Sequence, residues 1–181
     1  MDRDGKSVRF VTLVEPHLAD AYALARWLTR NRDDADEVLQ EACIRALAAI
    51  EQQSGTNVRA WLLAIIRNTA YTWLKAKKRI SLIGLDSLSE KDLARVEEGG
   101  AQGVPTTDPE AEMIARADAQ NLEKHINELP IEFREALVLR DIQGLGYHEI
   151  AQVTGVPVGT VMSRLARARR RLISALKETE A

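Results

Sequence analysis

The sequence predicts an all-α protein of two small helical domains joined by a flexible acidic linker. Ala, Leu, Arg and Glu are abundant, and aromatic residues make up only 4% of the 181 residues, which favours helices with modest aliphatic cores. Apolar residues recur at spacings of three and four on both sides of residues 81–109, a segment rich in Gly, Ser, Thr, Asp and Glu. We therefore expect a first domain over residues 7–80, a linker over 81–109 and a second domain over 110–178.

Composition narrows the possible functions. The single cysteine, Cys43, excludes an internal disulfide and a multi-cysteine zinc site, and its place on the apolar side of a predicted helix favours a buried thiol. The histidines lie far apart in the sequence, and no HExxH motif, Gly-rich phosphate loop or nucleophile elbow is present. No apolar run is long enough to span a membrane. We expect a soluble cytoplasmic protein that is not an enzyme and that has no catalytic residue, cofactor or bound metal.

The first domain is predicted to hold three helical segments. Residues 7–29 carry a helical apolar stripe, which Pro16 should kink or divide. Asp33 is expected to cap a second helix, which buries the apolar positions Val38/Leu39, Ala42/Cys43, Ala46/Leu47 and Ile50. Asn57 is a good N-cap for a third helix that ends near Arg79. Because the first half of this helix is apolar on nearly every face, it should lie at the centre of the bundle.

Two further helices are predicted at the start of the second domain. The first follows Asp108, which is a good N-cap, and runs to about Leu129. The next begins at Pro130 and continues to about Ile142.

Residues 144–171 predict a helix-turn-helix. Gly146 can cap the first helix, residues 147–153, with Glu149 three positions on. Gly155 supplies the left-handed conformation that reverses the chain, and Pro157 lies where the second helix starts and a missing N–H costs nothing. The small Ala151 lets the helices cross closely, and Val161 fills the gap between them.

Charge is strongly segregated along the chain although the formal net charge is only −2. Residues 81–112 contain eight acidic and two basic side chains, whereas every charge from Pro157 to Lys177 is positive. Such a helix can lie against phosphate, with its first turns facing base edges in the major groove. The alternative is a solvated surface helix. Because the turn geometry and the charge run coincide, we predict DNA contact.

Two other patterns lie in the first domain. The acidic residues 33–41, followed by Arg45, should form an outer helix face that repels phosphate and suits a basic protein surface. Taken by itself, however, this segment is better explained as a well-capped solvated helix. Residues 59–79 interleave Trp61, Tyr71 and Trp73 with basic side chains, as in surfaces that stack unpaired bases. Taken by itself, Trp61 is better explained as a core residue.

In its motifs the chain resembles an extracytoplasmic-function sigma factor, a minimal bacterial promoter-specificity subunit. The resemblance spans about residues 7–178 and rests on three segments in order. Residues 34–47, DADEVLQEACIRAL, resemble the helix of the family that binds core polymerase. Residues 57–79, NVRAWLLAIIRNTAYTWLKAKKR, resemble the segment that reads the −10 element. Residues 129–172, LPIEFREALVLRDIQGLGYHEIAQVTGVPVGTVMSRLARARRRL, resemble the domain that reads the −35 element.

The resemblance implies three sets of contacts. The set that would dock on the beta-prime clamp of core RNA polymerase is Asp36, Glu37, Gln40, Glu41 and Arg45. The set that would bind the melted −10 element, with an unpaired base trapped beside the loop 51–57, is Arg59, Trp61, Arg67, Asn68 and Lys75. The set that would meet the −35 element and its phosphates is Thr160, Ser163, Arg164, Arg167, Arg170 and Arg171.

The resemblance also implies that the linker threads toward the polymerase active-site channel and that an anti-sigma factor lodges between the two domains. Two residues depart from the family pattern: Met162 stands where Lys is common, and Thr154 replaces an apolar residue, which should loosen packing slightly. Two alternatives remain. A dimeric helix-turn-helix regulator of duplex DNA would leave the acidic face unexplained, and a sigma mimic that titrates an anti-sigma factor would usually carry a receiver domain.

Overall fold

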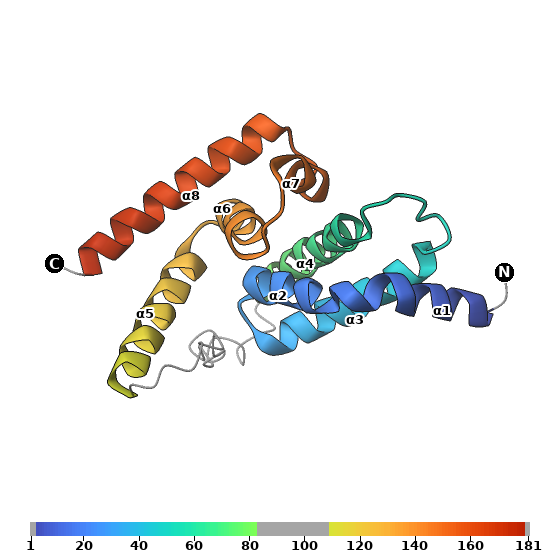
Figure 1. Cartoon of the computed structure of the whole chain (residues 1–181), viewed down its shortest axis with the longest axis horizontal. Helices are drawn as coiled ribbons and strands as arrows, with labels where there is room; N and C mark the ends of the chain where they lie inside the picture. The colour runs from blue at the N-terminus through green and yellow to red at the C-terminus, as the bar shows by residue number, and fades with distance from the viewer. Residues whose placement is uncertain (1–2, 83–108, 180–181) are drawn as a thin grey trace.

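The computed structural model describes residues 3–82 and 109–179, which form helices and short connections with no strand among them (Figure 1). The first bundle contains α1 (Arg3–Val14), a 3-10 helix (Glu15–His17), α2 (Leu18–Thr29), α3 (Arg32–Ala49) and α4 (Val58–Leu82). The second contains α5 (Pro109–Glu128), α6 (Ile131–Leu137), a π-helical turn (Val138–Ile142), α7 (Tyr147–Thr154) and α8 (Val158–Thr179). The all-α prediction is confirmed. The predicted linker lies almost wholly outside the described residues.

Pro16 divides the first helical segment, as predicted, because the backbone passes through the 3-10 helix there. The predicted cap of the next helix is wrong by two residues. Asn31, with an extended backbone, is the N-cap of α3, and its side-chain oxygen accepts a hydrogen bond from the backbone N–H of Asp34 at 2.9 Å. Asp33 instead lies inside the first turn of α3, where its negative charge interacts favourably with the helix dipole.

α3 buries a narrower stripe than the sequence predicted. The buried positions are spaced by three or four residues and are Ala35, Val38, Ala42 and Ala46, followed by Ile50 at the C-cap. Leu39 and Cys43 are only half-buried, and Leu47 is 39% exposed, so the prediction that Leu47 lies in the core is wrong. Small alanines at the contact let α3 lie close to its neighbours, which leaves residues beside the stripe at the surface.

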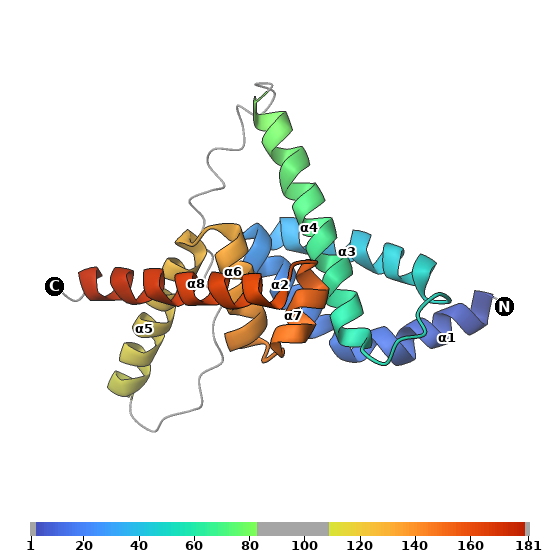
Figure 2. The same ribbon diagram turned by 90° about the horizontal axis from the view of Figure 1, so that it is seen from above.

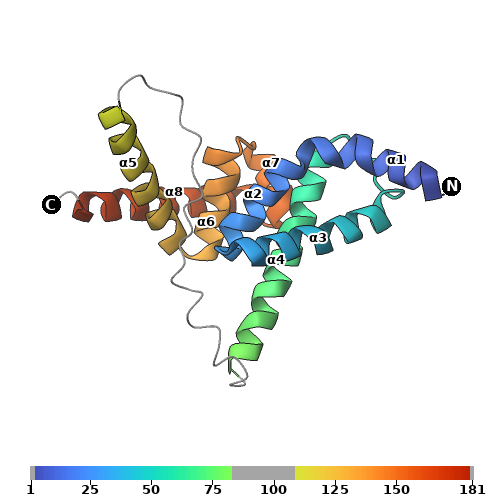
Figure 3. The same ribbon diagram turned by 90° about the horizontal axis from the view of Figure 1, so that it is seen from below.

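α4 is the central helix of the first bundle, and it packs against both α2 and α3. Asn57 caps it as predicted, since its side-chain oxygen accepts a hydrogen bond from the backbone N–H of Ala60 at 2.9 Å. Leu62, Leu63 and Ile66 are fully buried. The second half of α4 extends beyond the rest of the bundle, as Figures 2 and 3 show.

The predicted helix from Pro130 to Ile142 is not a regular α-helix throughout. α6 ends at Leu137, and the chain widens into the π-helical turn, where the backbone N–H of Gln143 donates to the carbonyl of Val138 at 2.9 Å. Gly144 follows with φ 73°. A positive φ favours glycine, so the sequence ends the helix at this residue.

The helix-turn-helix forms as predicted. The side chain of Glu149 accepts a hydrogen bond from the backbone N–H of Gly146 at 2.7 Å. Gly155 is left-handed with φ 69°, and Val161 is 1% exposed between the two helices. Thr154 is buried, and its hydroxyl donates to the carbonyl of Ile150 at 2.6 Å, so this departure from the family pattern leaves no unpaired polar group.

Substituting Gly155→Ala is expected to lower the free energy of unfolding by about 1–2 kcal/mol, because an alanine in the left-handed region clashes with its own backbone. No atom lies within 4 Å of the added Cβ, so the cost is backbone strain alone. The matched control is Gly159→Ala inside α8, where the added Cβ also meets nothing and φ is not positive. Because Gly159 is the second residue of α8, that change should stabilise the protein by at most roughly 0.5–1 kcal/mol. Denaturant unfolding measures both, and equal shifts would contradict the strain argument.

The two bundles pack against each other. α4 contacts α7 and α2 contacts α6, as Figures 1 and 2 show. One continuous cluster of buried side chains includes Leu62 and Ile66 of the first bundle and Leu139 and Ile150 of the second. The sequence predicted two small bundles joined by a linker and no particular contact between them, and the structure adds a shared apolar core.

Candidate nucleic-acid interface

α8 runs along the outside of the second bundle (Figure 2), and its sequence is rich in arginine. Leu165 and Ala168 are buried beneath the helix, which turns Arg167, Arg170 and Arg171 outward, and all three are exposed. Arg171 also lies over the ring of Phe133, 5.1 Å from its centroid. Three of the predicted −35 arginines are therefore accessible to phosphate or base edges.

Arg169 lies on the same helix but has an intramolecular role. Its guanidinium donates two hydrogen bonds to the carboxylate of Asp141, at 2.6 and 3.1 Å. This bidentate pair raises the pKa of Arg169 and ties α8 to the π-helical turn.

The first turns of α8 carry the predicted base-reading residues. Thr160 is half-buried, and Ser163 is exposed with its hydroxyl donating to the carbonyl of Thr160 at 2.9 Å. Met162, where the family often has Lys, is 52% exposed beside them. An apolar side chain at this place can meet a thymine methyl but cannot bind phosphate.

Two predicted −10 arginines of α4 are engaged with the second bundle. Arg59 donates from Nε to Asp20 Oδ2 at 2.7 Å and from Nη2 to the carbonyl of Gln143 at 2.8 Å. Arg67 donates from Nε to Glu135 Oε1 at 2.7 Å, and its side chain is 18% exposed. In this conformation both guanidinium groups have protein partners in place of nucleic acid.

Glu135 is the centre of this contact. Its side chain is fully buried, and it receives Arg67 and the hydroxyl of Tyr71 (3.3 Å) from α4 and Arg164 (4.0 Å) from α8. Burial raises the pKa of the Glu135 carboxyl, while the two arginines and the Tyr71 hydroxyl lower it again. The same burial raises the pKa of Tyr71. An ionised Glu135 therefore depends on its arginine partners.

The other predicted −10 residues of α4 lie differently. Asn68 and Lys75 are exposed, whereas Trp61 is half-buried and packs against the core, as its sequence context favoured. Lys77 forms an ion pair with Asp34 at 2.8 Å, which binds α4 to α3. The projecting end of α4 therefore keeps Lys75 available.

The predicted protein-binding face of α3 lies at the surface. All five predicted side chains are exposed, namely Asp36, Glu37, Gln40, Glu41 and Arg45. Arg45 and Glu41 form an ion pair at 2.8 Å, one turn apart. Ile44 and Leu47 are exposed on the same helix, at 64% and 39%. A face that mixes acidic and large apolar side chains suits a basic protein partner with an apolar centre.

The residues that join the two bundles are not predicted by the sequence patterns. Besides Glu135, the pair Asn57–Glu149 joins the N-cap of α4 to α7, with Asn57 Nδ2 donating to Glu149 Oε1 at 2.7 Å. Glu135 could have been noticed from its spacing, since it follows Ile131 by four residues and precedes Val138 by three, at a position where an apolar side chain is expected. No pattern in the sequence marks Asn57 as a residue that contacts the second bundle.

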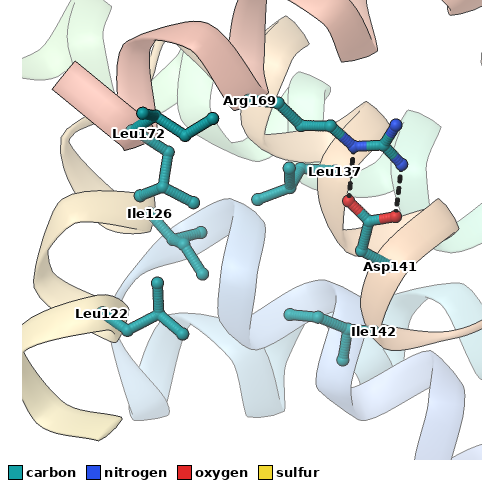
Figure 4. Close-up of a pocket in the computed structure, with 8 residues that line it drawn as sticks. Leu122, Ile126, Leu137, Asp141, Ile142, Arg169 and Leu172 are labelled. Carbon is teal, nitrogen blue, oxygen red and sulfur yellow. Dashed lines mark hydrogen bonds and ion pairs between the residues drawn. The ribbon is translucent and has the colours of Figure 1, made fainter. Parts of the chain in front are cut away.

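An apolar pocket of about 330 Å³ lies between α5, the end of α6 and α8, on the second bundle (Figure 4). The labelled side chains Leu122, Ile126, Leu137 and Leu172 line it, and the pair Asp141–Arg169 closes one side. This lining does not suit phosphate. Among residues 3–82 and 109–179 there is no cluster of potential metal ligands, and no helix there could cross a membrane.

Comparison with known proteins identifies both bundles. The model of sigma-70 region 2 matches residues 13–80, and that of sigma-70 region 4 matches residues 119–172. The chain is 32% identical over 155 residues to the ECF RNA polymerase sigma factor EcfG of Rhodopseudomonas palustris, covering 85% of this chain and 77% of that protein. It is 36% identical over 138 residues to the ECF sigma-E factor of Escherichia coli, covering 75% and 70% respectively.

Other similarities are consistent with these. The ECF sigma factor SigE of Mycolicibacterium smegmatis is 35% identical over 163 residues, which cover 88% of this chain but only 58% of that relative. The sigma factor RpoE of Bartonella quintana, solved with the anti-sigma factor NepR, superposes with a TM-score of 0.68 at 28% identity, covering 93% of this chain and 96% of that one. CnrH, solved with the cytosolic domain of CnrY, shares the fold with a TM-score of 0.59 at 24% identity. The chain belongs to the extracytoplasmic-function family of RNA polymerase sigma factors.

Proposed function

We propose that this chain directs core RNA polymerase to promoters, reading the −35 element with α8 and the −10 element with α4. The observation that carries the proposal is the combination, in one chain, of bundles matched to sigma-70 regions 2 and 4, each with a basic helix. A helix-turn-helix regulator of duplex DNA would need only the second bundle. The chain acts as an initiation factor, and we assign it no enzymatic activity of its own.

The second bundle would bind duplex DNA through α8. The exposed Arg167, Arg170 and Arg171 lie along one helix and would contact phosphates and base edges, with Thr160 and Ser163 facing the groove from the first turns. Arg164 would join them once it leaves Glu135. Each arginine that neutralises a phosphate should add about 0.9 to the slope of binding against salt.

The first bundle would bind the melted −10 element through α4. Asn68 and Lys75 are accessible, and Arg59 and Arg67 would become so when the bundles separate. Only part of the Trp61 ring would contact the trapped base, because the ring is partly buried against the core. The path of the acidic linker through polymerase stays a prediction, since residues 83–108 lie outside the described residues.

Polymerase would hold the exposed face of α3, with Asp36, Glu37, Gln40, Glu41 and Arg45 on the beta-prime clamp. Bringing both bundles onto one partner raises their effective concentration at the promoter, so weak individual contacts suffice. We further propose that the chain acts in the cytoplasm and that, like the Bartonella relative solved with NepR, it is held by an anti-sigma factor.

The experiment that tests this function is gel filtration of the purified chain with core RNA polymerase in the absence of any inhibitor. A sigma factor co-elutes with core polymerase in a complex of one chain per enzyme. A regulator that acts on duplex DNA alone would elute separately, and that result would contradict the proposal.

Replacing Arg167→Ala is expected to weaken promoter binding by the polymerase–chain complex by about 1–3 kcal/mol, because Arg167 is exposed on the outer face of α8. Fluorescence anisotropy at fixed salt measures the affinity. The matched control is Lys177→Ala, another exposed basic residue in the last turn of the same helix. If both variants bind as the wild type does, Arg167 does not contact the promoter.

A further inference from the structure

The loop between α3 and α4, residues 51–57, is held at both of its ends. Its start forms a turn in which the backbone N–H of Gln53 donates to the carbonyl of Ile50 at 3.3 Å. Its last residue is Asn57, whose side chain caps α4. Residues 54–56 form the tip between these two points, and all three are exposed. The tip is therefore the part of the loop that can meet a ligand.

α1 supplies two further contacts to the start of this loop, which lies beside it in Figures 2 and 3. Arg9 donates from Nη2 to the carbonyl of Gln53 at 2.6 Å. Lys6, three positions earlier and on the same face of the helix, forms an ion pair with Glu51 at 2.9 Å. Two residues of the loop are therefore tied to one face of α1.

α1 is itself fixed to the first bundle. Val14 is fully buried, and Phe10 and Leu13 pack against the same core. A helix held in this way can in turn hold what it contacts. Lys6 and Arg9 precede residue 13, where the match to sigma-70 region 2 begins, so that match assigns no role to either residue.

The Arg9 contact is the stronger of the two. Its donor is charged, and it meets the Gln53 carbonyl at a half-buried place. The side chains of Lys6 and Glu51 are 37% and 40% exposed, so water and salt screen their attraction. The hydrogen bond from Lys6 lowers the pKa of the Glu51 carboxyl, which keeps the pair charged at neutral pH. Arg9 should therefore carry most of the effect on the loop.

We propose that Arg9, with a smaller contribution from Lys6, is a positioning residue that holds the loop 51–57 in the shape that selects one unpaired base of the −10 element. The inference rests on the proposed binding of the melted −10 element beside this loop. A loop that is ordered in advance loses less conformational entropy when the base binds. A single loop shape also rejects bases that do not fit it, whereas a loose loop adapts to several.

Arg9→Met tests the contact because it keeps the apolar stem and removes the donor. The Nε of Arg9 is buried and has no hydrogen-bond partner among the residues that the structure describes, so the variant also loses an unfavourable buried N–H and should fold. Arg9→Lys keeps a charged donor and should restore part of the effect. The matched control is Arg26→Met, which removes the same charge from a half-buried position of α2 in the same bundle.

Amide hydrogen exchange of the free chain measures the order of the loop directly. The backbone N–H groups of Gln52 and Gln53 are hydrogen-bonded, at 3.0 and 3.3 Å. Arg9→Met should speed their exchange by about fivefold or more, because the turn loses the charged donor that holds it. Exchange at Ile66 in the core should not change, and Arg26→Met should leave the loop as it is in the wild type.

Base selection is measured with the complex of core polymerase and the full chain. The probe is a DNA duplex with an unpaired bubble whose bases are randomised in one strand, and the bound fraction is sequenced. The wild type and Arg26→Met should show a strong base preference at one bubble position. Arg9→Met should lower that preference by about fivefold and leave the other positions unchanged, with Arg9→Lys in between. A merely structural role would instead weaken binding at all positions alike.

Unchanged loop exchange and base preference in Arg9→Met would overturn the proposal, as would a loss shared equally by all bubble positions or by Arg26→Met. A wild type that binds the bubble without preference at any position would also overturn it. Should circular dichroism show that Arg9→Met does not fold, Lys6→Glu decides, because it sets two carboxylates against each other at the surface and should lower the preference at the same position alone.

These outcomes differ from a failure of the proposed function. In that case the wild type would not co-elute with core polymerase, whatever the exchange of the loop. A chain that binds polymerase and selects a base equally well with and without the Arg9 side chain is a sigma factor whose loop 51–57 needs no support from α1.

Discussion

Reversing the charges of Asp36 and Glu37 together, to Asp36→Arg/Glu37→Arg, is expected to abolish binding of the chain to core RNA polymerase. Both side chains are exposed on α3, so the fold should be little affected, within about 0.5 kcal/mol per residue. Like charges placed against a basic partner cost several kcal/mol, so the dissociation constant should rise by about a hundredfold or more. Titration of labelled core polymerase with each chain measures this.

The matched control for that variant is Glu15→Arg, which reverses an exposed acidic charge in the 3-10 helix of the same bundle. It should bind polymerase as the wild type does. If Glu15→Arg weakens binding as much as the α3 variant, the effect comes from overall charge and α3 is not the docking face. If neither variant weakens binding, the assignment of α3 is wrong.

Replacing Ile66→Ala is expected to destabilise the protein by about 2–5 kcal/mol, because it removes buried methyl groups and leaves a cavity. Ile66 is fully buried in α4 and belongs to the cluster shared by both bundles. The free energy of unfolding of a native protein is about 5–15 kcal/mol in total. The variant should therefore be partly unfolded well below the melting temperature of the wild type. Urea unfolding followed by circular dichroism gives the difference.

Ile44→Ala supplies the control, since it deletes the same atoms from a side chain that is 64% exposed. Its free energy of unfolding should stay within about 0.5 kcal/mol of the wild type. Similar losses for the two variants would show that α4 is not the centre of the core.

The sequence predicted the elements whose ends depend on local chemistry. Asn57 caps α4, Gly155 takes the left-handed turn, and Pro16 divides the first segment, because each effect is set by a residue and its immediate neighbours. The cap of α3 was misplaced from Asn31 to Asp33, since both residue types accept the same hydrogen bond and only the backbone angles distinguish them. Local signals therefore predict where a helix begins or ends, but they can misplace the capping residue where two suitable residues lie close together.

The parts that the sequence did not predict depend on contacts between distant residues. Leu47 is exposed because the alanines of α3 set how closely the helices approach, and this spacing is not visible in one helix alone. The engagement of Arg59 and Arg67 depends on residues 84 and 68 positions away in the chain. A basic side chain on a helix indicates an affinity for anions, but the fold decides which carboxylate or carbonyl oxygen lies within its reach.

The most direct test of the account is to map transcription start sites on total genomic DNA with purified core polymerase, with and without this chain. If the chain is a promoter-specificity subunit, starts should occur that depend on the chain, and the DNA upstream of them should share two short sequence elements at a constant spacing. If addition of the chain produces no new starts from any fragment, the account is contradicted.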